Sequence, residues 1–258
     1  MGQKKLIKFA AIKAYENVLE FPQDMQGKWA TFFDALNKGI TSTKLTLELA
    51  CGRGEYAVGL GRMFPEQQFI GIDLKGNRIW KGASIANKDG LKNVAFVRSQ
   101  IELTSNYFAK DEVDEIWITF PDPQLRWSKA KKRLTHPKFL RLYQQFLKKD
   151  GVVHLKTDSP LLYHFTLKVI EMYGLDLIYK TDHLYAEQNI DPRCLIKTYY
   201  EGLDIAQSNK IHYIQFNIGK DLPLELDEVL KEAIKDIPMD AGELIRMQAE
   251  AARAKKEA

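Results

Sequence analysis

The 258-residue chain has little cysteine and no long hydrophobic run. Cys51 and Cys194 are its two cysteines, which is too few for a disulfide framework or a cysteine-rich zinc site. No apolar run reaches the roughly 18 residues that a membrane-spanning helix needs. The N-terminal MGQKKLIKFAAIKAY has lysines but neither the apolar core nor the cleavage motif of a secretory signal. We therefore expect a cytoplasmic protein that does not enter a membrane.

The sequence also lacks the side-chain clusters of metal sites and of covalent catalysis. Its five histidines do not have the spacing of metal ligands. No serine, threonine or cysteine forms a recognisable pattern with a general base. We therefore expect neither a bound metal nor a covalent intermediate.

Acidic residues are missing from one long stretch. Nine Lys or Arg residues and no Asp or Glu lie between Gln124 and Lys149, although the formal net charge of the chain is only +4. The first fifteen residues hold four lysines and no acid. Clustered positive charge on a near-neutral chain favours a localised anion-binding face. A solvated helix surface is the alternative interpretation.

Apolar runs alternate with helical patterns along most of the chain, which predicts an α/β fold with a doubly wound, mostly parallel sheet and helices on both faces. We assign a helical lead-in to residues 1–40, the main domain to 41–220 and a charged helical tail to 221–258. The predicted strands are 44–50, 68–74, 94–99, 115–120, 151–157, 175–181 and 211–218, and the predicted helices are 55–64, 77–90, 136–149 and 160–174.

The stretch LELACGRGEYA places Gly52 and Gly54 after one strand and before a helix, as in the nucleotide loop of a doubly wound sheet. Asp73 follows nineteen residues after Gly54, at the end of the next strand. A carboxylate at that point accepts hydrogen bonds from both ribose hydroxyls. The pattern predicts that the first half of the chain binds an adenosine-containing cofactor.

Glu48 indicates which cofactor this is. It lies four residues before Gly52, where a carboxylate would repel the pyrophosphate of a dinucleotide. S-adenosylmethionine carries a sulfonium and an ammonium group, so an acid is favourable there. We therefore favour S-adenosylmethionine over a nicotinamide, although Ala57 completes a GxGxxA pattern that a nicotinamide enzyme also allows. The alternative for Glu48 is a carboxylate that caps a neighbouring helix.

The stretch FPDP holds Asp122 between Pro121 and Pro123, just past a predicted strand and immediately before the basic stretch. The two prolines restrict the backbone and so fix the carboxylate at the edge where doubly wound folds bind ligands. A rigid turn without a functional role is the alternative, because Pro and Asp both favour turns.

These residues together resemble the bacterial tRNA (guanine-N7)-methyltransferases, over roughly residues 33–218. The matching stretches are LELACGRGE, FIGIDLKGNRIWKGA, FPDP with KKRL behind it, HPKFL, HLKTD and TYYEGL. The resemblance implies a Rossmann-like methyltransferase fold. It also implies a tRNA-modifying activity that forms 7-methylguanosine in the variable loop.

The resemblance also implies roles for single residues. Glu48, Asp73, Gln100 and Asp122 match positions that bind the cofactor, and Asp122 is also assigned to catalysis. Arg126, Asp158, Thr198 and Glu201 match positions that bind the substrate. A helix cap is the alternative for Asp158, and routine polar positions are the alternative for Thr198 and Glu201.

The chain departs from the family pattern at several points. Gln-Leu follows FPDP where the family has tryptophan, Gln100 replaces an acid or asparagine, and Lys156 replaces a small residue. Trp127 stands three positions later than the usual tryptophan, where it either stacks on a base or packs onto its own domain. The tail past Ile218 exceeds the usual family length.

Guanine N7 carries a lone pair and no proton, so methylation there needs neither a deprotonating base nor a metal. This agrees with a sequence that has no cluster of metal ligands and no nucleophile paired with a base. We predict that Lys129, Lys131, Lys132 and Arg133 contact RNA phosphates. The rival hypotheses are a methyltransferase for another nucleic acid or a small molecule, a nicotinamide oxidoreductase, and a catalytically silent RNA-binding relative.

Overall fold

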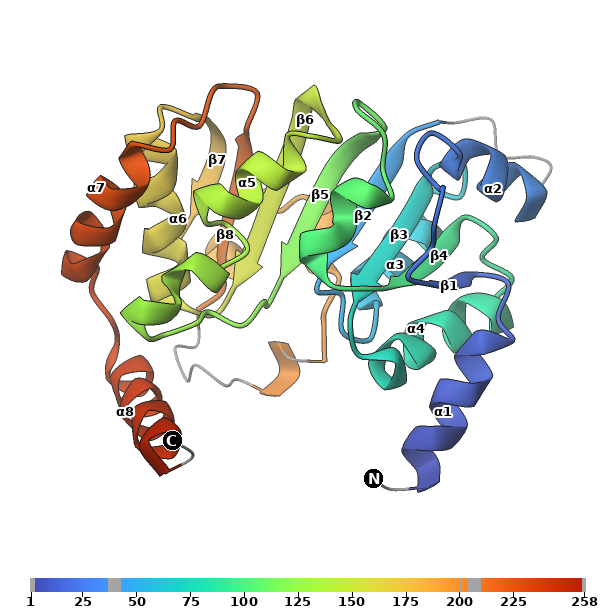
Figure 1. The fold of residues 1–258 in the computed structure, drawn as a ribbon, viewed down its shortest axis with the longest axis horizontal. Coiled ribbons are helices and arrows are strands. Elements are labelled where there is room, and N and C mark those ends of the chain that lie inside the picture. The colour runs from blue at the N-terminus through green and yellow to red at the C-terminus, as the bar shows by residue number, and fades with distance from the viewer. Residues whose placement is uncertain (1–2, 37–42, 200, 204–209, 257–258) are drawn as a thin grey trace.

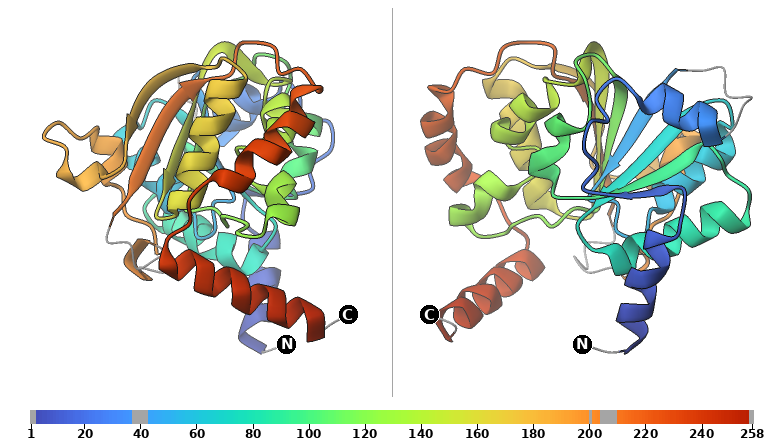
Figure 2. Two further views of the ribbon diagram at one scale, coloured as in Figure 1. Left: turned by 90° about the vertical axis from the view of Figure 1, so that its left-hand side faces the viewer. Right: turned by 45° about the vertical axis from the view of Figure 1, so that its right-hand side comes forward.

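Within the part of the chain that the structure describes, eight strands form one sheet in the order β1-β4-β3-β2-β5-β6-β8-β7 (Figure 1). The computed structural model describes residues 3–36, 43–199, 201–203 and 210–256. Helices lie on both faces of the sheet (Figures 1 and 2). The strands are β1 Val18–Glu20, β2 Leu45–Leu49, β3 Gln68–Asp73, β4 Val94–Arg98, β5 Val113–Thr119, β6 Leu147–Thr157, β7 Asp176–Thr181 and β8 His212–Asn217.

The strands from β1 to β6 pair in parallel, and β8 pairs antiparallel to both β6 and β7. The longer helices are α1 Gln3–Lys13, α2 Trp29–Leu36, α3 Glu55–Met63, α4 Gly76–Lys88, α5 Pro137–Tyr143, α6 Pro160–Met172, α7 Leu226–Ala233 and α8 Ala241–Lys256. The short 3-10 helix η2 covers Trp127–Lys132. This arrangement confirms the predicted doubly wound, mostly parallel sheet.

The chain reverses its direction of winding at β2. This strand pairs with β3 on one side and with β5 on the other. The loops that leave β2 and β5 therefore run to opposite sides and open a crevice between them, which is where doubly wound sheets bind ligands. The glycine loop follows β2 and the FPDP turn follows β5, so the two motifs meet at this point.

The central strands are apolar because helices cover both of their faces. Every residue of β2 and β3 is buried. One core cluster, which includes Leu47, Ile70 and Ile116, packs on one face. A second cluster, which includes Tyr56 and Trp117, packs on the other. A strand buried on both faces reads as a continuous apolar run, which is why the sequence reveals these strands clearly.

Two expectations about the elements were wrong. The lead-in is not only helical, because Val18–Glu20 forms β1 and pairs in parallel with β4 at the edge of the sheet. The helix predicted over 136–149 ends at Tyr143, and β6 begins at Leu147. Phe146 accepts a backbone hydrogen bond from Val113 at 3.0 Å, which draws this segment into the sheet. The apolar residues here fit a helical and an extended pattern equally well.

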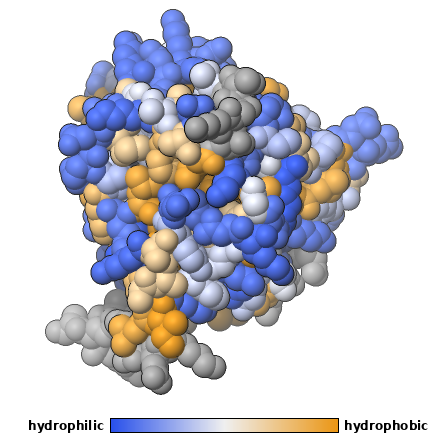
Figure 3. All heavy atoms as spheres, turned by 90° about the vertical axis from the view of Figure 1, so that its right-hand side faces the viewer, coloured by the Kyte–Doolittle hydropathy of each residue, from blue (hydrophilic) through white to orange (hydrophobic). Residues whose placement is uncertain are grey.

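The helices α1 and α8 extend beyond the carboxyl edge of the sheet, on opposite sides of the molecule (Figures 1 and 2). On the face beside the β1 edge, hydrophobic and hydrophilic residues are interspersed (Figure 3). None of the described helices is long and apolar enough to cross a membrane.

Candidate active site

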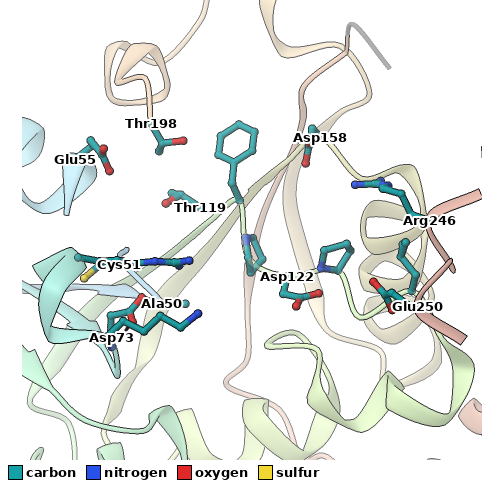
Figure 4. A pocket seen from close by; sticks show the side chains of 16 residues that line it. Ala50, Cys51, Glu55, Asp73, Thr119, Asp122, Asp158, Thr198, Arg246 and Glu250 are labelled. Carbon is teal, nitrogen blue, oxygen red and sulfur yellow. Dashed lines mark hydrogen bonds between the residues drawn. The ribbon is translucent and has the colours of Figure 1, made fainter. Parts of the chain in front are cut away.

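A pocket of about 470 Å³ opens at the carboxyl edge of the sheet, where β2 and β5 diverge (Figure 4). This volume suits a small-molecule ligand. Five segments contribute to the pocket: the glycine-loop side, the FPDP turn, the end of β6, the loop that contains Thr198 and the tail helix α8. Its lining residues are Ala50, Cys51, Glu55, Asp73, Lys75, Arg78, Thr119, Phe120, Pro121, Asp122, Pro123, Leu125, Asp158, Thr198, Arg246 and Glu250.

Asp73 holds the glycine loop in shape. Its two carboxylate oxygens accept the backbone N–H of Gly52 at 2.9 Å and of Lys75 at 2.7 Å. Each oxygen keeps a further lone pair, and the side chain lines the pocket. The carboxylate is thus available to a ligand's hydroxyl groups, in the position predicted for the ribose.

Gly52 and Gly54 are required by the backbone. Their φ angles are 56° and 70°, in the left-handed region that favours glycine. A Cβ on Gly54 would also overlap the ring of Phe96. The loop therefore depends on these two glycines for its path, while its neighbours Ala50 and Cys51 line the pocket.

Both strand exits at the crevice contain non-glycine residues with positive φ. Ala50, just after β2, has φ 55°, and Phe120, just after β5, has φ 48°. Such conformations cost of order 1–3 kcal/mol each, and they cluster at functional sites. The paired strain at the two strands that flank the crevice supports a ligand site there.

Asp122 is exposed on the FPDP turn and lines the pocket. One carboxylate oxygen accepts the backbone N–H of Gln124 at 2.9 Å, which closes a local turn. The other oxygen has no hydrogen-bond partner among the described residues, and the side chain is one of those that line the pocket (Figure 4). Both of the interpretations based on sequence therefore describe part of the geometry, because Asp122 shapes the turn and also faces the pocket.

Arg133 was wrongly predicted to contact RNA phosphates. Its side chain is fully buried and donates to the carbonyls of Pro123 and Gln124, both at 3.1 Å. It also lies over the ring of Phe165, 4.5 Å from the ring centre. Burial lowers the pKa of Arg133 to about 10. A guanidinium fork suits two adjacent carbonyls, so this arginine braces the turn that carries Asp122.

Glu48 caps a helix and does not line the pocket. One of its oxygens accepts the backbone N–H of Ala57, in the first turn of α3, at 2.8 Å. The other accepts the hydroxyl of Thr119 at 3.3 Å. Burial raises the pKa of Glu48 to about 8. The geometry thus matches the capping alternative, and Thr119 lies between the acid and the pocket as a lining residue.

Gln100 does not reach the pocket. It is exposed at the start of the short helix that follows β4, and its side chain forms no cap there. Gln100 follows a strand end, but sequence spacing does not specify where a side chain points. An adenine contact by Gln100 has no support in this arrangement.

Thr198 lines the pocket, whereas Glu201 is held by a buried lysine. Lys156, in β6, donates to Glu201 at 3.1 Å and to the carbonyl of Cys194 at 2.8 Å. Tyr185 donates a hydrogen bond to the same carboxylate. Lys156 is therefore an anchor that ties the loop of Thr198 to the sheet, which accounts for the departure from the family pattern at this position.

Asp158 lines the pocket at the end of β6. The cap of α6 is the neighbouring Ser159, whose hydroxyl accepts the N–H of Leu162 at 3.2 Å, so the alternative of a helix cap by Asp158 is wrong. Arg126 lies outside the lining residues and forms an ion pair with Glu250 at 3.9 Å.

The basic segment after the turn divides into exposed and buried residues. Lys131 and Lys132 are exposed, Lys129 is half-buried, and Arg133 is buried. Trp127 packs against the core of its own domain. This is the second of the two roles considered for it from the sequence, the first being stacking on a base. The three lysines remain candidates for phosphate contacts.

Several pocket residues were missed by sequence reasoning. Lys75 and Arg78 lie at the start of α4 within the motif FIGIDLKGNRIWKGA, and Glu55 ends the motif LELACGRGE, so the motifs themselves carry the signal for these three residues. Arg246 and Glu250 belong to α8, and no sequence pattern connects that helix with the site.

Within the described ranges, no group of three or more His, Cys, Asp or Glu residues is arranged to hold a metal ion. The described part of the site offers carboxylates, hydroxyls, backbone amides and cations. These groups can bind a polar organic ligand, orient a planar base and stabilise positive charge.

Comparison with known proteins agrees with this geometry. A family model described as "Putative methyltransferase" matches residues 42–213. The chain is 44% identical to a tRNA (guanine-N(7)-)-methyltransferase of Bacteroides thetaiotaomicron, with 93% of each chain covered. It is 46% identical to the protein of that name from Porphyromonas gingivalis, with 82% of this chain and 83% of that protein covered.

Among solved structures, the 16S rRNA methyltransferase KamB matches with a TM-score of 0.52 and 12% identity, over 72% of this chain and 92% of that chain. At this identity the match concerns the fold alone, which is the predicted Rossmann-like methyltransferase fold. Because these relatives cover 93% and 82% of the chain at more than 40% identity, the chain belongs to the tRNA (guanine-N(7)-)-methyltransferase family.

Proposed function

We propose that this protein transfers a methyl group from S-adenosylmethionine to N7 of a guanosine in the variable loop of tRNA. The observation that carries the proposal is that Asp73 and Asp122 face one pocket from opposite sides of the crevice (Figure 4). We assign one acid to the ribose of the cofactor and the other to a second reactant. The names of the sequence relatives support tRNA guanosine as that reactant.

The glycine-loop side fits the cofactor. The proposed cofactor contacts are the carboxylate of Asp73 to the ribose and the backbone around Ala50, Cys51, Gly52 and Gly54 to the amino-acid part. S-adenosylmethionine supplies an electrophilic methyl group on a positively charged sulfur. Glu48 acts from beneath this half of the pocket, because it fixes the first turn of α3 through Ala57 and orients the hydroxyl of Thr119.

Asp122 and Asp158 face the substrate half. A guanine base presents N1–H and an exocyclic amino group, and carboxylates are the natural acceptors for both. Methylation gives the guanine ring a positive charge, which a nearby carboxylate stabilises. No proton has to be removed from N7, so the residues need to position the base and need not include a general base.

The exposed lysines support RNA as the carrier of this guanosine. Lys131 and Lys132 lie beyond the turn that carries Asp122 and are open to solvent. Contacts to phosphates give affinity without reading sequence. The exposed lysines also argue against a small-molecule substrate, because such a substrate would not need a basic surface outside the pocket. The cytoplasmic location expected from the sequence is part of this proposal, because tRNA is modified there.

The experiment is methyl transfer from labelled S-adenosylmethionine to bulk tRNA, followed by nucleoside analysis of the product. We expect label in 7-methylguanosine, and we expect none when the transcript has adenosine in place of the variable-loop guanosine. Label in a different nucleoside, or in a small molecule and not in tRNA, would contradict the proposal. Binding of tRNA without any transfer would favour the catalytically silent alternative.

A further inference from the structure

The tail helix α8 reaches the pocket from a part of the sequence that no motif links to the site. Arg246 and Glu250 line the pocket beside Asp122 and Asp158. They stand four residues apart and so project from the same face of α8. In Figure 4 the guanidinium end of Arg246 points away from its helix and into the pocket, on the side where Asp158 lies.

Glu243 attaches α8 to the main domain. It is fully buried and accepts hydrogen bonds from the hydroxyl of Ser159 and, at 3.2 Å, from the N–H of Leu161, in the first turn of α6. It also forms a capping box with Asp240, whose carboxylate accepts the N–H of Glu243 at 2.6 Å. One side chain therefore caps two helices and fixes the direction of α8 next to Asp158.

Arg246 has donors that lack acceptors. Its Nε and Nη2 atoms are shielded from solvent, and neither has a hydrogen-bond partner in the described structure. A buried donor without a partner is costly, and more so on a charged group. An acceptor brought by a ligand would remove this cost. The unsatisfied guanidinium is therefore suited to bind a ligand with an anionic or strongly accepting group.

We propose that Arg246 binds the backbone phosphate of the target nucleotide and that α8 is part of the RNA-binding site. This proposal rests on the proposed function. A guanidinium binds phosphate through two parallel hydrogen bonds, which matches a pair of unsatisfied donors on one side chain. Arg246 also lies on the substrate side of the pocket, across from the glycine loop that is proposed to bind the cofactor (Figure 4).

A contact with the guanine base fits less well. Arginine typically binds the O6 and N7 atoms of guanine together, which would block the atom that has to react. A positive charge at N7 would also oppose the positive charge that develops on the ring. Phosphate satisfies the same donors and leaves N7 free. The acids Asp122 and Asp158 then remain next to the base, and the cation lies next to its phosphate.

The test compares Arg246→Ala and Arg246→Lys with the wild type in binding an unmodified tRNA transcript over a series of salt concentrations. We expect the alanine variant to bind about 10-fold to 100-fold more weakly, with a salt slope reduced by about one unit. The lysine variant should recover the slope because it keeps the charge, but only part of the affinity because it loses the paired geometry. The exposed Lys231→Ala on α7 is the matched control for charge loss and should behave as wild type.

Two further measurements separate this role from a structural one. The midpoint of thermal unfolding of Arg246→Ala should stay the same or rise, because the change removes unsatisfied buried donors. Its affinity for S-adenosylhomocysteine should stay the same. The inference would be overturned if Arg246→Ala bound tRNA with the affinity and salt slope of the wild type. It would also be overturned if the variant lost affinity for S-adenosylhomocysteine but kept its affinity for tRNA. Failure of the wild type to methylate tRNA would instead overturn the proposed function, which binding measurements alone do not test.

Discussion

Glu48 shows what a single buried carboxylate does at this site. Desolvation raises its pKa to about 8, and the bonds from Ala57 and Thr119 only partly oppose that rise. At neutral pH most of this carboxyl group is therefore protonated in the absence of ligand. A cationic ligand in the pocket would favour the charged form, so ligand binding and proton release are linked through this residue.

The pKa of Glu48 predicts a pH dependence of stability. A group whose pKa is higher in the folded than in the unfolded chain stabilises the fold fully below about pH 4.5. This contribution is lost as the pH rises through about 8. Between pH 5 and pH 8 the free energy of unfolding should therefore fall less in Glu48→Gln than in the wild type. The difference between the two falls should be on the order of a few kcal/mol.

Chemical denaturation of both proteins at several pH values measures this difference. Comparison of the two proteins is needed because buried His136 and His212, with pKa values lowered to about 4, act in the opposite direction and stabilise the fold as the pH rises. These histidines are present in both proteins and cancel in the comparison. If the free energy of unfolding changed with pH in the same way in both proteins, the raised pKa of Glu48 would be contradicted.

Asp122 is predicted to act in methyl transfer and not mainly in tRNA affinity. Asp122→Asn keeps an oxygen that can accept the N–H of Gln124, so the turn should persist while the negative charge is lost. Single-turnover transfer at saturating tRNA and cofactor should fall by roughly two to three orders of magnitude. The exposed Asp176→Asn in β7 is a matched control. Wild-type transfer by the saturated Asp122→Asn protein would reduce FPDP to a structural turn.

At the scale of elements, α8 depends on the contacts of Glu243. Glu243→Ala removes the acceptor for Ser159 and Leu161 and breaks the capping box with Asp240. We expect a loss of about 1–3 kcal/mol in the free energy of unfolding, because buried donors lose their acceptor. Proteolytic cleavage before α8 should also become faster.

Glu232→Ala is the control for this change, because Glu232 is an exposed acid on α7 that pairs with the exposed Lys235. It should leave both stability and cleavage unchanged. Equal cleavage rates in wild type and Glu243→Ala would show that α8 is held by other contacts. In that case the position of Arg246 would not depend on Glu243.

The elements that sequence reasoning found are those with a strong local pattern. The buried runs of β2 and β3 and the glycine loop were predicted because apolar strands and left-handed glycines leave clear signals. The short strand β1 was missed because three half-buried residues carry no such signal. The convergence of parallel strand ends placed Asp73, Asp122 and Asp158 on one pocket, and their functional roles remain predictions.

The sequence did not predict the direction of single side chains or the packing between segments that are far apart in the chain. Lys131, Lys132 and Arg133 are adjacent in one basic stretch, yet the first two are exposed and the third is buried. Arg133 is buried because its guanidinium binds the carbonyls of Pro123 and Gln124 and packs over the ring of Phe165. The approach of α8 likewise depends on a contact between Glu243 and Ser159, which are 84 residues apart.

At the scale of the whole molecule, positive charge is unevenly distributed. The formal net charge is only +4, but the exposed Lys131 and Lys132 belong to the basic stretch that directly follows the FPDP turn of the pocket. A local basic surface of this kind attracts a polyanion and loses affinity as salt screens it. The binding of tRNA by this protein should therefore depend strongly on ionic strength.

Two sets of variants test this distribution of charge. Replacement of Lys131 and Lys132 together by alanine should reduce the salt slope of tRNA binding by about two units, one for each phosphate contact. Arg133→Ala should leave the slope unchanged and lower the rate of methyl transfer, because the turn that carries Asp122 loses its brace. A reduced slope in Arg133→Ala with an unchanged rate would restore the original assignment of this arginine to phosphate.

The helices α1 and α8 both extend from the edge of the sheet that holds the pocket (Figures 1 and 2). A fusion partner or affinity tag joined beyond either helix would therefore lie on the side of the molecule where the pocket opens and not on the opposite side. A tag of histidines would add titratable cations there, and a bulky one would occupy the approach of the substrate. Protein for activity measurements should therefore carry removable tags, and a small fluorescent label attached after α8 would lie near the pocket that is proposed to bind RNA.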